Sequence, residues 1–177
     1  MDIPKITPLL LEQLKKVKPS RDEFGTGIEY YPCKVTLKDG SSFDRVYVQE
    51  SESYITHWGV WPKEDNHKKS IPITEVVQIE ESPFRLPAKL ANKMYKAGES
   101  GMGYCVFTLV LEDGEKLPCV TGNAVDFPNL PPDVNPSMII DLLPHKGREE
   151  LQDGRGRSLL DQYKHVSDYY WCLYEKI

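Results

Sequence analysis

The residue types that could carry chemistry in this chain of 177 residues gather in two loops. The first loop, Gly98 to Gly103, reads GESGMG, and closely spaced glycines let a ligand approach the backbone. A phosphate-binding loop follows a strand and opens a helix, whereas here the predicted order is helix, glycines, strand. We therefore interpret the loop first as a connection, and we retain Glu99 as a ligand-binding candidate.

The second loop, Thr121 to Phe127, follows a predicted core strand. It carries an amide and an acid, Asn123 and Asp126, that folding does not obviously require, and function concentrates on such loops. The alternative is an Asx turn that leads into Pro128, because Asn and Asp side chains bond locally to the backbone. Both interpretations stay open.

The spacing of histidines and cysteines predicts neither a metal centre nor a reactive thiol. The histidines lack both the i, i+4 spacing of a helical metal site and zinc-finger spacing to a cysteine; they are His57, His67, His145 and His165. A metal site assembled from distant positions is the alternative. His145 is kept as a ligand- or partner-binding candidate. Three cysteines lie in apolar, strand-like runs, so we expect reduced, buried thiols; they are Cys33, Cys105 and Cys119. No catalytic residue, metal ligand or cofactor is predicted.

Aromatic residues flank the polar segment 62–70. Tyr54, Trp58 and Trp61 are typical of a hydrophobic rim of the core. They could instead be exposed anchors of an interface, since Trp and Tyr are enriched at binding hot spots. We keep Trp58 and Trp61 as partner-binding candidates.

Charge and hydropathy argue against two classes of partner. The net charge is −5, with 22 basic and 27 acidic residues, whereas nucleic-acid binders usually carry a basic face. No segment approaches the about 20 apolar residues that span a bilayer, and the N-terminus does not read as a signal peptide. We therefore expect a cytoplasmic protein that binds neither nucleic acid nor membrane.

Three helices are predicted. The first runs from Pro8 to about Lys18, with Thr7 as its cap, and the second from Leu86 to Ala97, with Gly98 at its C-terminal end. The third is opened by Ser158 and carries a broad apolar surface to the end of the chain. Because that surface is wider than one docking face needs, we expect this helix to contribute to a homodimer or to a partner interface.

Two hairpins dominate the predicted strands. Alternating apolar residues flank Asp-Gly turns at positions 39–40 and 113–114, which predicts hairpins over residues 31–48 and 104–121. Further strands are expected near residues 53–58 and over residues 71–80, while residues 137–143 fit a strand or a short helix.

The two hairpin regions are similar to each other. Superposing their turns pairs Cys33 with Phe107, Val35 with Leu109 and Phe43 with Leu117, and an apolar run closes each unit. This pattern is that of an internal duplication, although any two hairpins with Asp-Gly turns resemble each other. The general pattern is similar to small SH3-like or Sm-like barrels. No motif supports a particular family, so the resemblance implies no functional residue.

We therefore predict an α+β fold of two similar antiparallel β-units joined by a helix, with helices at both ends, in one compact domain. The predicted divisions are residues 1–28 (N-terminal helix and loop), 29–85 (first β-unit), 86–98 (connecting helix), 99–144 (second β-unit) and 145–177 (linker and final helix).

The expected function is a non-enzymatic protein-binding module, such as a regulator, an inhibitor or an immunity-type partner. The alternative is a small enzyme or ligand-binding protein whose site lies between the 98–103 and 121–127 loops. A pocket lined by the loop candidates would favour the alternative, and a flat surface there would favour the protein-binding module.

Overall fold

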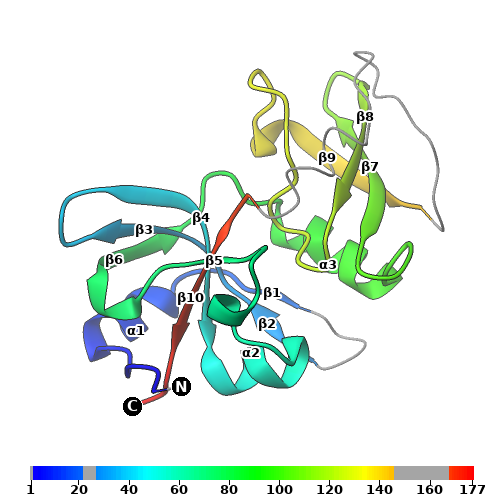
Figure 1. Ribbon diagram of the computed structural model, residues 1–177. Helices are drawn as coiled ribbons and strands as arrows, with labels where there is room; N and C mark the ends of the chain where they lie inside the picture. The colour runs from blue at the N-terminus through cyan, green and yellow to red at the C-terminus, as the bar shows by residue number, and fades with distance from the viewer. Residues whose placement is uncertain (1, 22–26, 146–167) are drawn as a thin grey trace.

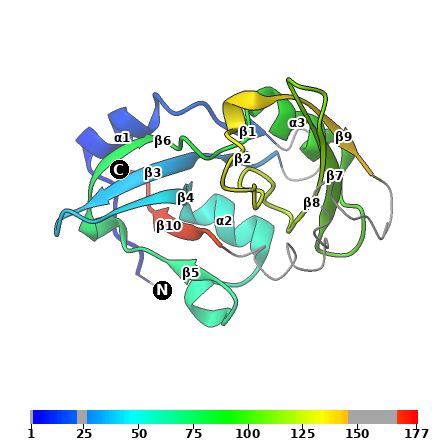
Figure 2. The same ribbon diagram turned by 90° about the horizontal axis from the view of Figure 1, so that it is seen from above.

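The computed structural model describes residues 2–21, 27–145 and 168–177, and it is a mixed α+β structure (Figures 1 and 2). The α-helices described are α1 (Pro8–Leu14), α2 (Ser51–Trp58) and α3 (Ala88–Ala97). Short 3-10 turns are η1 (Pro62–Glu64), η2 (Ile73–Glu75) and η3 (Pro136–Met138). The strands are β1 (Ser20–Arg21), β2 (Glu29–Tyr30), β3 (Pro32–Leu37), β4 (Ser42–Glu50), β5 (Lys69–Ser70), β6 (Val76–Glu81), β7 (Cys105–Leu111), β8 (Lys116–Thr121), β9 (Ile139–Pro144) and β10 (Tyr170–Tyr174).

The strands form two principal sheets, which lie in two lobes (Figure 1). The larger sheet has the order β5-β10-β4-β3-β6, and the smaller one has the order β8-β7-β9. A short two-stranded ladder, β1-β2, lies beside them. No closed barrel is found in the part of the chain that the structure describes.

Both predicted hairpins are confirmed, as β3-β4 and β7-β8. Each is extended by a third antiparallel strand, β6 or β9, which follows a 3-10 turn. The registers correspond: Val35 pairs with Phe43 and Ile79, and Leu109 pairs with Leu117 and Leu142. Residues 139–144 are therefore a strand, which settles the choice left open by the sequence.

The first two predicted helices are confirmed at α1 and α3, although both are shorter than expected. The Thr7 hydroxyl accepts a hydrogen bond from Leu10 N and caps α1, and Gly98 ends α3 with a φ of 79°. Each helix packs on the last strand of a three-stranded unit, α1 on β6 and α3 on β9. The side chain of Gln13 accepts a hydrogen bond from Ile79 N on the outer edge of β6.

Both faces of the larger sheet are buried. Successive residues of its central strands point to opposite sides, so each face packs into an apolar cluster of its own. Val46, Val48 and Cys172 pack with α1 in one apolar cluster. Tyr47 and Trp171 face the other way and join a second cluster that includes α3 and the inner face of the smaller sheet. This second cluster holds the two lobes together.

The expected C-terminal helix is wrong over residues 170–174. These residues form β10, which lies parallel to β4 on one side and to β5 on the other. The successive residues Trp171 and Cys172 are both fully buried, on opposite faces, which suits a central strand, whereas the spacing of apolar residues in the sequence predicts a helix. Their aromatic surface is covered by the chain itself, so it does not support the expected interface. The beginning of the predicted helix, residues 158–167, lies outside the described residues.

The strand expected near residues 53–58 is also wrong, because Ser51–Trp58 is helix α2. Glu50 precedes the helix in an extended conformation and Gly59 ends it with a φ of 71°, a left-handed conformation that glycine adopts readily. None of the helices described has the length and hydropathy needed to span a bilayer. The four cysteines are buried and none of them forms a disulfide, as expected for three of them.

Deletion of residues 170–177 should abolish cooperative unfolding, because it exposes the paired edges of β4 and β5 and removes Trp171 from the core. The loss in the free energy of unfolding should exceed about 3–5 kcal/mol, which is the cost of truncating one large aromatic core residue. Urea denaturation followed by near-ultraviolet circular dichroism measures it.

Deletion of residues 176–177 alone is the control. It removes the exposed Ile177 and the ion pair of the exposed Lys176 with Glu50, at 3.6 Å, and should change stability by less than about 1 kcal/mol. A cooperative transition retained without residues 170–177 would contradict the central place of β10.

Candidate functional site

Two pockets lie between the lobes, one on each side of Asn123. The first has a volume of about 200 Å³ and the second about 180 Å³. The loop after α3 contributes Gly98 and Glu99 to the first pocket and Gly103 to the second. Asn123, from the loop after β8, lines both. The structure thus places a pair of hollows between the two loops that the sequence singled out.

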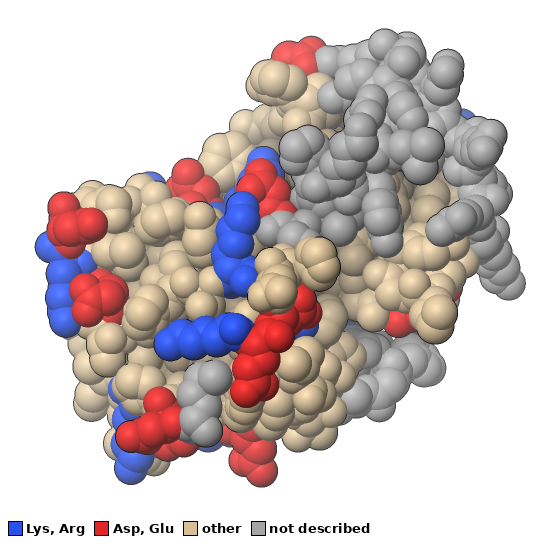
Figure 3. All heavy atoms as spheres, viewed as in Figure 1, with Lys and Arg blue, Asp and Glu red and all other residues tan. Residues whose placement is uncertain are grey.

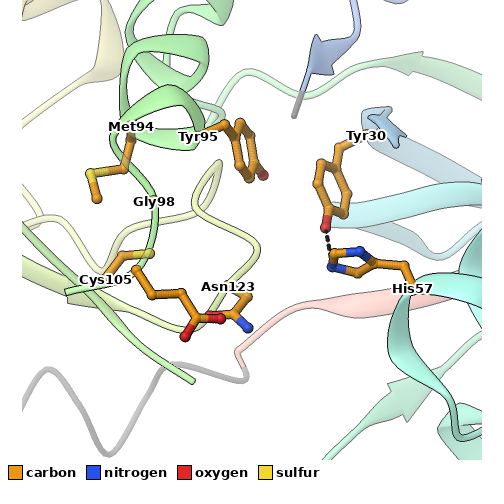
Figure 4. Close-up of a pocket in the computed structure, with 8 residues that line it drawn as sticks. Tyr30, His57, Met94, Tyr95, Gly98, Cys105 and Asn123 are labelled. Atoms are coloured by element: carbon orange, nitrogen blue, oxygen red, sulfur yellow. Dashed lines mark hydrogen bonds between the residues drawn. The ribbon is translucent and has the colours of Figure 1, made fainter. Parts of the chain in front are cut away.

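The first pocket is walled by aromatic side chains from both lobes (Figure 4). Tyr30 of β2 and Tyr95 of α3 stack with ring centroids 5.1 Å apart. The Tyr30 hydroxyl lies 3.2 Å from Nε2 of His57, which comes from α2. Met94 and Cys105 lie on the opposite side of the opening from His57 (Figure 4).

Glu99 brings an acid to this pocket. Its Oε2 accepts a hydrogen bond from Gly103 N at 3.2 Å, which holds the loop closed on itself. Burial raises the pKa of the Cys105 thiol to about 12, and the negative charge of Glu99 acts in the same direction. Since the thiolate is the nucleophile, Cys105 is not a reactive cysteine here.

The second pocket combines indole rings with an ion pair. Trp58, Tyr169 and Trp171 line it together with Lys68 and Asp65. Nζ of Lys68 lies 4.3 Å from the centroid of the Trp58 ring and 3.6 Å from an Asp65 oxygen. Burial lowers the pKa of Lys68, although Asp65 opposes that shift. The pocket therefore holds a cation that is partly withdrawn from water.

Three residues of these pockets carry a buried polar atom that has no hydrogen-bond partner among the described residues. They are Oδ1 of Asn123 and the indole nitrogens Nε1 of Trp58 and Trp171. A buried donor or acceptor left without a partner costs about 1–3 kcal/mol. In a fold that satisfies most of its buried groups, three such atoms around one cleft call for an explanation.

Asp126 does not line either pocket, unlike Asn123 and Glu99, because it is fully buried beneath the cleft. The hydroxyls of Tyr95 and Tyr47 donate to its Oδ2 at 2.7 and 3.2 Å, and the Ser20 hydroxyl donates to its Oδ1. The Arg85 guanidinium lies 3.6 Å from the same Oδ1. These residues come from both lobes, so Asp126 is a structural residue that joins them and not a surface ligand.

Neither loop residue makes the local Asx turn that the sequence allowed. The carboxylate of Asp126 bonds to residues distant in sequence, and Oδ1 of Asn123 has no hydrogen-bond partner among the residues described. Two other candidates lie outside the pockets. His145 follows β9, and its Nε2 is 2.6 Å from the hydroxyl of Thr108 on β7. Trp61 stacks on Tyr54, with ring centroids 6.4 Å apart.

The site offers binding groups more clearly than catalytic ones. No group of three or more His, Cys, Asp or Glu suited to a metal ion occurs within residues 2–21, 27–145 and 168–177. The described thiols are buried, and burial raises the pKa of Cys33 well above its usual range. What the pockets present is hydrogen-bond donors, an acceptor and charges of both signs.

Sequence reasoning missed most of the pocket lining. Tyr30, His57 and Tyr95 are far apart in the chain, and only the meeting of the lobes brings them together. The sequence pattern predicts a helix around Trp171, and that prediction does not place Trp171 beside Lys68. A usable signal was present in residues 65–68, where an acid, a histidine and a lysine follow an aromatic helix.

The chain matches no family model, no curated protein and no solved structure in comparisons with known proteins. Its function must therefore be argued from its own geometry.

Substitution Arg85→Met should destabilise the protein by about 3–5 kcal/mol, because it leaves the buried Asp126 carboxyl without its cation. The guanidinium also donates to the carbonyl oxygens of Leu86 and Lys18, and those acceptors lose a donor too. Urea denaturation at neutral pH measures the change.

Lys93→Met is the matched control, since it removes an exposed ion pair with Asp141 at 2.9 Å. It should cost less than about 1 kcal/mol. An Arg85→Met effect as small as that of the control would show that the buried pair does not join the lobes.

The destabilisation caused by Asp126→Asn should shrink as pH rises. Burial raises the pKa of Asp126 above 3.8, although Arg85 and the hydroxyl donors oppose that shift. A folded-state pKa above the unfolded value means that stability is fully present below the unfolded pKa and is lost as pH rises through the folded pKa. Asparagine does not titrate, so the two unfolding free energies should converge in denaturation experiments over a pH series above about 4. A difference that widens with pH would contradict the raised pKa.

Proposed function

We propose that this chain is a binding protein for a small polar molecule, held between the 98–103 and 121–127 loops. The observation that carries the proposal is Oδ1 of Asn123, a buried acceptor without a partner among the described residues, in a side chain that lines both pockets. Folding alone gives no reason to keep such an atom. A ligand that donates a hydrogen bond to it does.

The meeting of two lobes supports this proposal. Ligand sites occur preferentially where two structural units meet, because each supplies one wall. Here the first lobe contributes His57 and Trp58, and the second contributes Glu99 and Asn123. We also propose that the two three-stranded units arose by internal duplication, which their matching registers support.

A protein-binding module, with a protein partner or a second copy of the chain, is the second candidate function. Met102 favours it, since 96% of its surface is exposed on the loop that borders the second pocket. Addition of a partner strand at the outer sheet edges is disfavoured. Ile79 N already bonds to Gln13, and Leu142 N bonds to the side chain of Asp141.

The described surface gives no support to nucleic-acid binding. On the face in Figure 3, acidic and basic side chains are intermingled, and no basic field covers it. Among the ion pairs of the described residues, Lys69 lies 3.2 Å from Asp168, and Arg45 lies 3.8 Å from the same acid. Cations paired in this way are less available to phosphates.

Substitution Asn123→Leu tests the proposal. If Asn123 is kept for a ligand, removal of its unpartnered acceptor should leave the unfolding free energy of the ligand-free protein unchanged or raise it by about 1 kcal/mol. Chemical denaturation of the purified, dialysed protein measures this.

Asn135→Leu is the matched control. Asn135 caps η3, and its Oδ1 accepts a hydrogen bond from Ser137 N at 3.0 Å. Loss of this cap should cost about 0.5–2 kcal/mol. If Asn123→Leu destabilises the protein as much as Asn135→Leu, Asn123 has a structural role and the binding proposal is wrong.

A further inference from the structure

The second pocket contains unused hydrogen-bond donors as well as an unused acceptor. Nε1 of Trp58 and Nε1 of Trp171 are buried and have no partner among the described residues. Both indoles make edge-on ring contacts, 5.4 Å apart at an interplanar angle of 64°. An N–H that faces a ring gains at most a weak hydrogen bond. Neither indole N–H therefore has a strong acceptor among the described residues.

The ring faces are less available than the indole edges. Lys68 lies over one face of Trp58, and Tyr47 stacks on Trp171 with centroids 4.9 Å apart. A ligand that stacks, such as a nucleobase, would compete with these contacts. Recognition by hydrogen bonds and charge fits the pocket better than recognition by stacking.

Lys68 adds a positive charge next to the unused donors. Its side chain is only 14% exposed, and its ammonium lies 3.1 Å from the Tyr54 hydroxyl. Asp65, at 3.6 Å, is the acid that it pairs with. An ammonium in such a partly desolvated place gains from an additional anionic ligand, because charge-assisted hydrogen bonds are stronger than neutral ones. The indole side of the cleft is therefore suited to a carboxylate.

The Asn123 side of the cleft has the opposite character. Oδ1 of Asn123 is an acceptor, and the carboxylate of Glu99 lines the pocket beyond it. An ionised carboxylate has about four acceptor positions, of which the Gly103 N–H fills one here. No lysine or arginine is among the described residues that line this first pocket. It suits a ligand that carries a positively charged donor.

We propose that the ligand is a free α-amino acid, bound as its zwitterion. Its carboxylate bonds to the indole N–H groups and Lys68, and its ammonium bonds to Asn123 on the side of Glu99. This inference rests on the proposed binding function and names its ligand class. The pocket volumes of about 180 and 200 Å³ agree with a ligand as small as an amino acid, since pockets for drug-sized molecules usually exceed about 300 Å³.

The test is isothermal titration calorimetry of the dialysed full chain with a panel of common L-amino acids. At least one should bind. For the tightest binder, the amine without its carboxylate and the acid without its amino group should each bind at least about tenfold more weakly, because each lacks one charge-assisted contact. Equal binding of the amine or of the acid alone would overturn the zwitterion assignment, and so would a panel without any binder.

Variants of the indoles locate the carboxylate. Trp58→Phe keeps an aromatic ring but removes the N–H, and it should weaken binding of the tightest-binding amino acid by about tenfold. Trp61→Phe is the control, since Trp61 does not line the pocket, and it should bind as the wild type does. Circular dichroism verifies that both variants fold. Unchanged binding by Trp58→Phe would show that the indole N–H of Trp58 does not bond to the ligand.

The two proposals fail separately. If Asn123→Leu leaves the ligand-free protein as stable as the wild type and no amino acid binds, the binding function survives and the ligand class is wrong. If Asn123→Leu destabilises the protein as a lost cap would, the binding function itself fails.

Discussion

The structure depends on one buried carboxyl group. Asp126 receives hydroxyl donors from β1, β4 and α3, and its backbone carbonyl accepts from Leu86 N at 2.8 Å. A carboxyl group taken out of water is costly unless it is paired and hydrogen-bonded, so the elements that supply its donors must meet around it. Those elements belong to both lobes. The positions of the two loops, and hence of the cleft between them, follow from this requirement.

The cleft therefore results from the packing of the two lobes. It is also where buried polar atoms have no hydrogen-bond partner among the described residues. Beneath it the donors of the Asp126 network have acceptors, whereas around it Oδ1 of Asn123 and Nε1 of Trp58 and of Trp171 have no hydrogen-bond partner among the described residues. Satisfied groups rigidify a core, and unsatisfied groups lower stability. The contrast between adjacent layers separates the part of the interface that holds the lobes from the part available to a ligand.

The strongest local signals in the sequence, the two Asp-Gly turns, predicted local structure correctly. The Asp-Gly turns at 39–40 and 113–114 set both hairpins, since glycine permits the positive φ that these turns require. Signals failed where distant partners decide. Residues 170–174 form a strand because β4 and β5 lie on both sides of them, and the sequence of that segment alone fits either form. Of the candidate site, the loops that carry Glu99 and Asn123 could be predicted, but their neighbours Tyr30 and Trp171 could not, because tertiary contacts alone bring them there.

The position of β10 also has a consequence for the order in which the chain folds during synthesis. The smaller lobe, α3 with β7, β8 and β9, pairs strands that are close in sequence, and such contacts form early. The larger sheet waits for residues 170–174, which pair with residues 46–50, and Ile6 N bonds to Glu175 O near the other end of the chain. On the ribosome, β4 has an unpaired edge until these last residues emerge. A chaperone that covers exposed strand edges would therefore act on this edge of the first lobe.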